Sequence, residues 1–215
     1  ALHGDLLADQ DQRQAAGDRL ADLVRAGAFR IATGFVGTPL ICDVLTDEGY
    51  PELAHRLLLQ TAAPSWLYPV TMGATTVWER WDSLLPDGTI NPSGMTSFNH
   101  YALGSVVDWV HRRVAGLAPA APGYRRISIR PIPPRQLAHA SARHVTPYGE
   151  AAVSWRRVDG GLVIDAVVPV GTVADVELPW GGGAFTVGHG QHSWQVVDPG
   201  SVPLQIVTVR QLMDD

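Results

Sequence analysis

Cysteine is almost absent from the 215-residue chain, which contains only Cys42. An intrachain disulfide is therefore excluded. Because Cys42 lies in the apolar run "PLICDVL", we expect its thiol to be a small buried hydrophobic group. No apolar run approaches the roughly 20 residues that cross a bilayer, so we expect no transmembrane helix.

Clustered positive charge is also lacking. The formal net charge is −5 at pH 7, and the arginines occur as short, separated pairs that we interpret as solvated. Nucleic acids and anionic membranes bind clustered positive charge. We therefore expect neither a nucleic acid nor a membrane as a partner.

The beginning of the chain carries no start or export signal. It reads "ALHGDLLADQDQRQ", without an initiator methionine and without the basic and apolar segments of a signal peptide. We therefore expect a piece of a longer polypeptide. The composition is compatible with a cytoplasmic and with a secreted protein, and both stay open.

Residues 1–117 have a helical pattern. A helix is predicted from Asp9 to Gly27, with Asp9 or Asp11 as its cap and apolar residues spaced by three and four. Those apolar residues are Ala16, Leu20, Leu23 and Val24. A second helix is predicted with Thr38 as its cap and Pro39 in its first turn, and a third is predicted to begin at Pro51.

Residues 67–96 show no sustained helical period and are predicted to form a long ordered loop, a feature that is usually functional in a compact domain. A fourth helix is expected from Ser97 or Asn99 to about Ala115. Its predicted buried residues are Leu103, Val106, Val107, Val110 and Val114.

Residues 118–215 have a different pattern. The proline-rich stretch "APAAPGYRRISIRPIPPRQ" predicts an extended connector with one short strand at "RRISIR". Short strand-like runs follow, and Asp159-Gly160-Gly161 indicates a hairpin between two of them, as in an antiparallel β-sandwich. The runs are "AAVSWRRV", "GLVIDAVV", "VADVELP", "AFTVGHG" and "LQIVTVR".

Glu79, in "GATTVWERWDS", is the first candidate for chemistry, because it lies between Trp78 and Trp81 in the predicted loop. A carboxylate in such surroundings can act as an acid or a base, and tryptophan faces bind sugar rings. The alternative is structural: Glu79 pairs with Arg80 or a backbone donor while the tryptophans fill the core.

His100, in "MTSFNHYALGS", is the second candidate. A histidine near a helix N-terminus tends to be neutral and can hydrogen-bond a hydroxyl, but it can equally cap the helix through a backbone bond. The other histidines show no ligand spacing with a supporting acid, so no metal site is expected.

Four motifs together resemble the C-terminal half of the catalytic domain of bacterial α-L-rhamnosidases, glycoside hydrolase family 78: "TGFVGTP", "PSWLYPV", "GATTVWERWDS" and "SFNHYALG". The stretches "GYRRISIRPIP", "TPYGEAAVSW" and "VVPVGTVADVELP" resemble the family's C-terminal β-sandwich more weakly. The resemblance implies a multidomain α then β chain, with part of an (α/α)6 barrel in residues 1–117. The connector and an antiparallel β-sandwich would occupy residues 118–215.

The same resemblance implies an inverting glycosidase that removes terminal α-L-rhamnose from glycosides or polysaccharides without a metal or organic cofactor. By position, Glu79 matches the general base and His100 a histidine that contacts rhamnose. The tryptophans in matching motifs, expected to bind substrate, are Trp78, Trp81 and Trp66.

The family's general acid belongs to a motif in the N-terminal half of the barrel that has no match here, and Asp82 is too close to Glu79 in sequence to be assumed its substitute. We therefore expect a base without its acid. A few helices cannot close the barrel, so the missing half or an oligomer partner should cover exposed apolar faces. The alternatives are a non-catalytic carbohydrate-binding or assembly fragment, and an (α/α)6 glycosidase that acts on another sugar.

Overall fold

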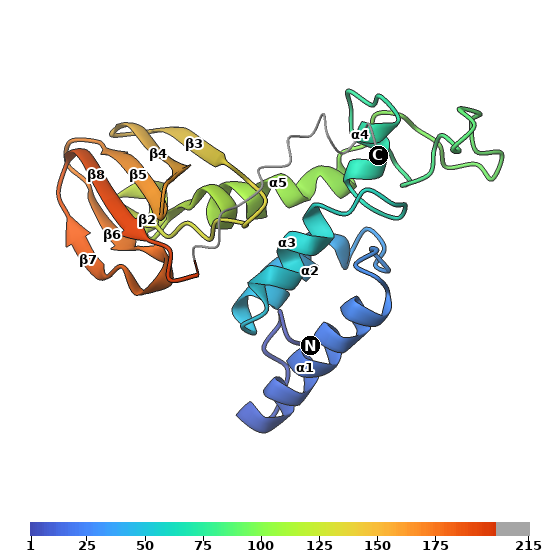
Figure 1. The fold of residues 1–215 in the computed structure, drawn as a ribbon, viewed down its shortest axis with the longest axis horizontal. Helices are drawn as coiled ribbons and strands as arrows, with labels where there is room; N and C mark the ends of the chain where they lie inside the picture. Colours follow the sequence, from blue (N-terminus) through green and yellow to red (C-terminus); the bar gives the residue numbers. More distant parts are fainter. Residues whose placement is uncertain (201–215) are drawn as a thin grey trace. The chain divides into compact units, whose positions relative to one another are not determined.

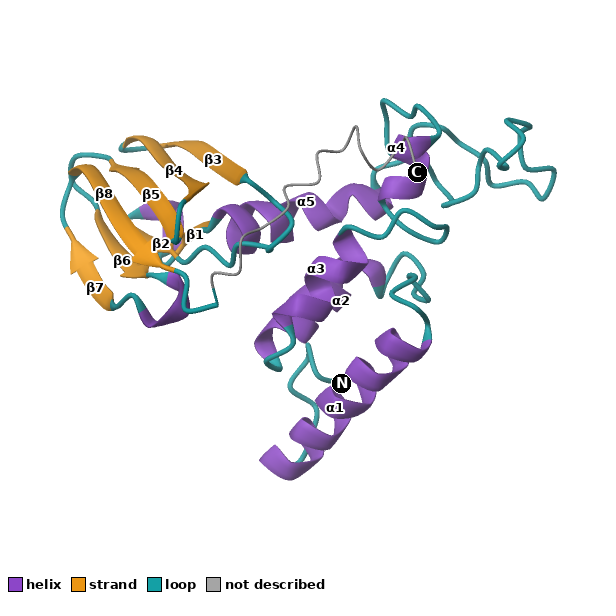
Figure 2. Cartoon of the chain, in the orientation of Figure 1, coloured by secondary structure: helices purple, strands orange, loops and turns teal. Residues whose placement is uncertain are grey.

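The computed structural model describes residues 1–200, and the chain divides into two compact units, Ala1–Val107 and Asp108–Asp215 (Figure 1). The first unit is helical with one long irregular segment, and the second is built on two β-sheets (Figure 2). The strand predicted at "LQIVTVR" lies outside the described residues.

The first helix, α1 (Gln10–Ala26), begins where its cap predicts. Asp9 is extended, and its Oδ1 accepts a hydrogen bond of 2.8 Å from the backbone N–H of Gln12. The cap is thus Asp9, the first of the two candidates. Part of the predicted apolar face was wrong, because Leu23 is 51% exposed and the buried residues are Gly17, Ala21 and Val24.

Helix α3 (Pro51–Leu58) begins at the predicted residue, whereas α2 (Thr38–Asp47) has Gly37 as its cap instead of Thr38. Helices α2 and α3 contact each other, and α1 contacts both. Complete burial of a large aliphatic side chain contributes about 1.5–3 kcal/mol, so this small core holds the three helices together. Its members include Ile41, Cys42, Leu45, Leu53, Ala54 and Leu57. The buried Cys42 confirms the expected role of the thiol.

The fourth helix differs from its prediction. It begins at Ala102 as a 3₁₀ turn (η1, Ala102–Ser105), continues as α5 (Val106–Trp109) and ends as a π-helix (η2, Val110–Ala115). The predicted start at Ser97 or Asn99 was wrong because Ser97 is hydrogen-bonded to Glu79 in another segment of the loop, and Asn99 is hydrogen-bonded to Ser97. The prediction that Val107 is buried was also wrong, because Val107 is 64% exposed. Trp109, which was not predicted to be buried, is 1% exposed. Changing the number of residues per turn shifts the buried face around the helix.

The predicted loop after residue 67 contains one short helix, α4 (Leu67–Thr71), which the sequence pattern missed. Beyond α4 the chain is irregular up to η1, apart from an isolated antiparallel bridge between Leu84 and Ile90. The expectation of a long ordered segment is otherwise confirmed.

The second unit contains two four-stranded sheets, with strand orders β1-β2-β6-β7 and β3-β4-β5-β8 (Figure 1). The first comprises β1 (Leu117–Pro119), β2 (Arg126–Ile129), β6 (Val173–Glu177) and β7 (Ala184–Val187). The second comprises β3 (His139–Thr146), β4 (Gly149–Val158), β5 (Gly161–Val168) and β8 (Gly190–Val197). Two short 3₁₀ turns, Pro122–Tyr124 and Pro179–Gly181, lie between strands.

Among residues 1–200, the strand pairing confirms a sandwich that is antiparallel except for one pair. The hairpin at Asp159-Gly160 joins β4 to β5 as predicted, but β2 and β6 are parallel. Strands β1, β3 and β8 were missed. Strand β1 has only three residues, and β3 and β8 are the outer strands of their sheet, rich in His, Ser and Gln. Edge strands bury less, so their apolar alternation is weak.

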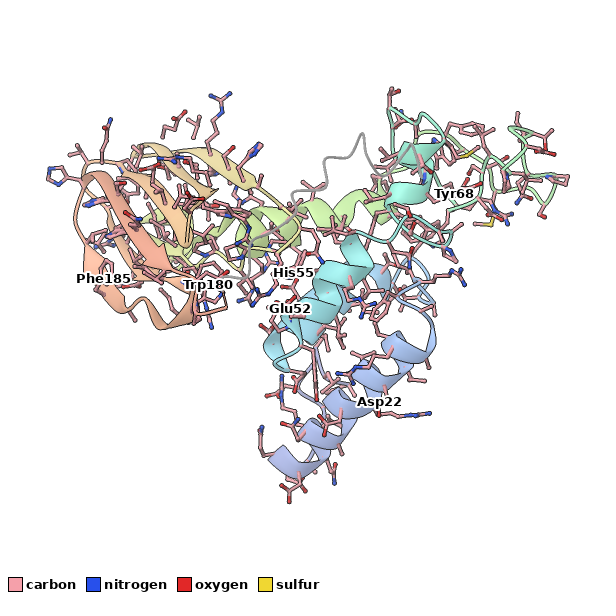
Figure 3. All side chains as sticks on the ribbon, in the orientation of Figure 1. Asp22, Glu52, His55, Tyr68, Trp180 and Phe185 are labelled. Carbon is pink, nitrogen blue, oxygen red and sulfur yellow. The ribbon has the colours of Figure 1, made fainter. Side chains whose placement is uncertain are left out.

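The core of the sandwich lies between the sheets. Trp155 of β4 is 1% exposed, and its Nε1 donates a 2.8 Å hydrogen bond to the carbonyl of Val114 in η2. Outside this core, Phe185 of β7 (Figure 3), which is 38% exposed, contacts Trp194 of β8 with ring centroids 5.7 Å apart. The π-helical turn ends at Gly116, whose φ is 95°. A Cβ there would lie 2.4 Å from the backbone nitrogen of Pro131, so only glycine fits.

Candidate active site

Two stretches of the long loop run antiparallel and are hydrogen-bonded to each other. The backbone N–H of Glu79 donates to the carbonyl of Ser97 over 2.9 Å, and that of His100 donates to the carbonyl of Val77 over 2.8 Å. The two predicted site residues, distant in sequence, therefore belong to one pair of hydrogen-bonded segments.

The carboxylate of Glu79 is half-buried and bonded to backbone. Its Oε2 accepts a hydrogen bond of 3.1 Å from the N–H of Ser97. Arg80 is engaged elsewhere, since its guanidinium donates to Asp82 over 2.7 Å and to the carbonyl of Gly94 over 3.3 Å. Glu79 thus has one of its two expected structural partners, a backbone donor. The other expected partner, Arg80, forms its ion pair with Asp82.

Asp82 serves as an anchor of the loop. Its Oδ1 accepts from Arg80, and its Oδ2 accepts from Nδ2 of Asn91 over 2.9 Å. Asn91 is only 6% exposed, and its Oδ1 accepts from the N–H of Ser93 over 3.0 Å. Both carboxylate oxygens of Asp82 are thus occupied in holding the loop.

A tyrosine ties this loop to helix α4. Tyr68 (Figure 3) lies on α4, is 9% exposed, and donates its hydroxyl proton to the carbonyl of Leu84 over 2.9 Å. Burial, together with the nearby charges of Asp82 and Asp87, raises the pKa of the Tyr68 hydroxyl above its usual value of 10.0. Tyr68 therefore stays protonated as a hydrogen-bond donor.

The three predicted tryptophans occupy different environments. Trp78 is 4% exposed and packs edge-on against Phe98, with centroids 5.3 Å apart. Trp66 and Trp81 are half-buried and meet edge to face at 5.8 Å, and Nε1 of Trp66 donates to the carbonyl of Leu103 over 2.8 Å. Trp78 thus fills the interior, whereas Trp66 and Trp81 keep part of their surface accessible.

His100 is bonded to the start of the fourth helix. Its Nδ1 accepts a hydrogen bond of 3.2 Å from the N–H of Ala102, the first residue of η1. Its ring also stacks on Phe35 and Tyr101, with centroid distances of 5.0 and 5.4 Å. The sequence reasoning missed Phe35, although Phe35 belongs to the motif "TGFVGTP" that carried the resemblance.

The parts of the chain outside this site give little support for other chemistry. Within residues 1–200, no three His, Cys, Asp or Glu side chains gather closely enough to hold a metal ion, and no helix is long and apolar enough to cross a membrane. A groove of about 640 Å³ lies on the β3-β4-β5-β8 sheet, and its lining includes Ser141, Ser154, Asp165 and Ser193. It contains none of the predicted site residues.

Both units match known protein families. Residues 1–114 match the bacterial alpha-L-rhamnosidase 6 hairpin glycosidase domain, and residues 116–202 match the bacterial alpha-L-rhamnosidase C-terminal domain. The chain belongs to the bacterial α-L-rhamnosidase family. The resemblance of the four motifs and the order of a helical region followed by a β-sandwich are thereby confirmed.

Curated members of the rhamnosidase family are similar over most of this chain. An α-L-rhamnosidase of Streptomyces avermitilis is 46% identical over 78% of the chain, and one of Formosa agariphila is 42% identical over 83%. The aligned parts cover 16% and 19% of those proteins. The chain therefore spans less than a fifth of the length of these glycoside hydrolases.

Solved rhamnosidase structures share the fold. The native enzyme from Aspergillus terreus superposes with a TM-score of 0.88 and 45% identity, covering 92% of this chain and 23% of that one. The Streptomyces avermitilis enzyme complexed with L-rhamnose has a TM-score of 0.82 and 40% identity, covering 87% of this chain and 20% of that one.

Proposed function

We propose that this chain is part of an inverting α-L-rhamnosidase that releases terminal α-L-rhamnose from glycosides or polysaccharides. The observation that carries the proposal is the hydrogen-bonded pair of segments that holds Glu79 and His100 together. Relatives named α-L-rhamnosidase, and a similar structure complexed with L-rhamnose, support the reaction and the sugar.

In this proposal Glu79 is the general base. The bond from the N–H of Ser97 engages Oε2 and orients the carboxylate, so Oε1 can accept a proton from the water that attacks the anomeric carbon. A carboxylate held by one backbone donor keeps acceptor capacity for that water.

The rhamnose contacts are assigned to His100, Trp66 and Trp81. The two tryptophans retain accessible ring surface, and His100 brings a ring nitrogen that can hydrogen-bond a sugar hydroxyl. Trp78 is 4% exposed and packs against Phe98, so it supports the segment that carries Glu79 and is not assigned a direct rhamnose contact.

The general acid is proposed to come from a part of the enzyme that this chain does not span. Inverting glycosidases use two carboxyl groups about 6.5–9.5 Å apart, so that water fits between one of them and the sugar. Asp82, the acid nearest to Glu79 in sequence, has both oxygens engaged by Arg80 and Asn91. Residues 1–117 would then be one portion of an (α/α)6 barrel, with 118–215 as connector and sandwich.

Rhamnose release from a rhamnose-containing disaccharide tests this function, because a sugar leaving group needs the acid. The chain extended by the rest of its barrel should release β-rhamnose first, which ¹H NMR of the fresh product detects. Glu79→Gln should lower kcat by roughly 10²- to 10⁴-fold. Glu150→Gln, at an exposed position of β4, should leave kcat unchanged.

Three results would contradict the proposal. Release by the 215-residue chain alone that depends on Glu79 would place a working acid within it or in another copy of it. Formation of α-rhamnose as the first product would exclude inversion. Binding of rhamnosides without release by the extended protein would favour the non-catalytic carbohydrate-binding alternative. A panel of aryl glycosides separates rhamnose from other sugars.

A further inference from the structure

The motif "TGFVGTP" forms a tight turn between α1 and α2. The N–H groups of Gly37 and Thr38 both donate to the carbonyl of Gly34, over 3.1 and 2.9 Å. The hydroxyl of Thr38, which is 1% exposed, also donates to this carbonyl over 2.9 Å. The turn therefore has a defined shape, and Phe35 lies on it.

Phe35 is presented by this turn to the ring of His100. The two rings stack with centroids 5.0 Å apart and planes inclined by 16°. Tyr101 stacks on the same imidazole at 5.4 Å and 7°. Because the backbone N–H of His100 is bonded to Val77, the residue is held at its main chain and at its ring.

The Nδ1 nitrogen of His100 accepts a hydrogen bond from the start of the fourth helix. The N–H of Ala102 donates to Nδ1 over 3.2 Å, so Nδ1 must offer a lone pair. In a neutral imidazole one nitrogen accepts and the other donates, which places the proton on Nε2. A proton on Nδ1 would face the N–H of Ala102 and leave one of the helix's first N–H groups without an acceptor.

We propose that Phe35, with Tyr101, is a positioning residue that orients His100 as its neutral Nε2–H tautomer, and that this Nε2–H donates to a hydroxyl of the bound rhamnose. The proposal rests on the function proposed above and assigns a role to the turn that carries Phe35. His100 then supplies a hydrogen bond and no proton transfer, which leaves base catalysis to Glu79.

The tautomer is measurable without any activity. Long-range ¹H–¹⁵N spectra of the 215-residue chain, with His100 assigned by its loss in His100→Gln, should show an unprotonated Nδ1 and a protonated Nε2. In the chain extended by the rest of its barrel, adding L-rhamnose should shift the Nε2 signal and leave Nδ1 nearly unchanged. A predominant Nδ1–H form would overturn the tautomer, and an Nε2 signal that rhamnose does not move would overturn its role as donor.

Variants of the turn test Phe35 in the extended enzyme. Phe35→Leu should raise KM for the rhamnoside by roughly 2- to 10-fold with kcat nearly unchanged, because an aromatic pair of this kind contributes on that order to fixing a ring. Phe35→Tyr, which keeps the ring, should restore KM. Val36→Ala, the adjacent position of the turn and 87% exposed, should match the parent.

Two patterns of result would separate this inference from the proposed function. Equal KM in Phe35→Leu and the parent would overturn the positioning role, even in an active rhamnosidase. A fall in kcat with KM unchanged would indicate general damage to the fold and would overturn it too. An Nε2–H that shifts with rhamnose in a protein without rhamnosidase activity would support the inference while contradicting the glycosidase.

Discussion

The carboxylates of Glu79 and Asp82 lie close in sequence but have different hydrogen-bond partners. Asp82 receives a guanidinium and a buried amide, which occupy both of its oxygens. Glu79 receives one backbone N–H on one oxygen. The carboxylate with more acceptor capacity remaining is the better candidate for accepting a proton from water, and this difference in bonding supports the proposal of Glu79 over Asp82 as the base.

Cys42 should be unreactive in the folded chain. Its thiol is 1% exposed, and burial, with the charge of Asp43, raises its pKa from 9.0 to about 12. Only the thiolate is nucleophilic, so a disulfide reagent at pH 8 should react with Cys42 only after unfolding in urea. Rapid stoichiometric reaction without urea, followed by absorbance, would contradict the burial.

At the level of secondary structure, the carboxylate of Asp175 links three strands of the first sheet through an ion pair and a hydroxyl hydrogen bond. Arg126 of β2 donates to both oxygens of Asp175 in β6, each over 2.5 Å, and Thr186 of β7 donates to the same carboxylate over 3.0 Å. The bonds from Arg126 lower the pKa of Asp175 below its usual 3.8. This pair spans the parallel contact between β2 and β6.

Asp175→Asn should make the sandwich slightly less stable at neutral pH and less sensitive to acid. Because the pKa is lowered on folding, the stabilisation is complete above pH 3.8 and is lost as pH falls through the lowered value. The side chains are 47% and 41% exposed, so the loss at pH 7 should be below about 1 kcal/mol.

Urea unfolding at pH 7 and near pH 3 measures this effect. The difference between parent and Asp175→Asn should shrink at the lower pH. Asp159→Asn, in the exposed turn between β4 and β5, is the matched control and should follow the parent at both. A difference that grows as pH falls would contradict the stated direction of the pKa shift.

At the level of the whole molecule, the helical unit exposes apolar side chains that isolated domains normally cover. Leu23 is 51% exposed, Val107 64% and Met95 65%. The chain spans only about a fifth of each similar solved structure. We therefore propose that the missing part of the barrel, or another copy of the chain, covers these side chains in the assembled enzyme.

The 215-residue chain by itself should consequently associate as its concentration rises. Sedimentation velocity should show a growing average mass, because exposed apolar side chains favour association. Leu23→Glu combined with Val107→Glu should reduce it, whereas Val145→Glu, on β3 of the sandwich and 78% exposed, should not. A concentration-independent monomer would argue against an uncovered face.

Much of the architecture was predictable because its signals are local. The cap at Asp9, the prolines that begin α2 and α3, and the hairpin at Asp159-Gly160 act on neighbouring backbone atoms, and the structure has each of them. Edge strands β3 and β8 were missed because only one side of an edge strand pairs within its sheet, so the apolar alternation is weak.

Contacts between distant segments decided the rest. The sequence by itself determined the helix starts, the turn chemistry, the family motifs and the candidacy of Glu79 and His100. Only the tertiary structure decided that Ser97 bonds Glu79 instead of starting a helix, that Arg80 pairs with Asp82, and that Phe35 stacks on His100. Local propensity is weak compared with such contacts, and a single sequence does not state which distant segments will meet.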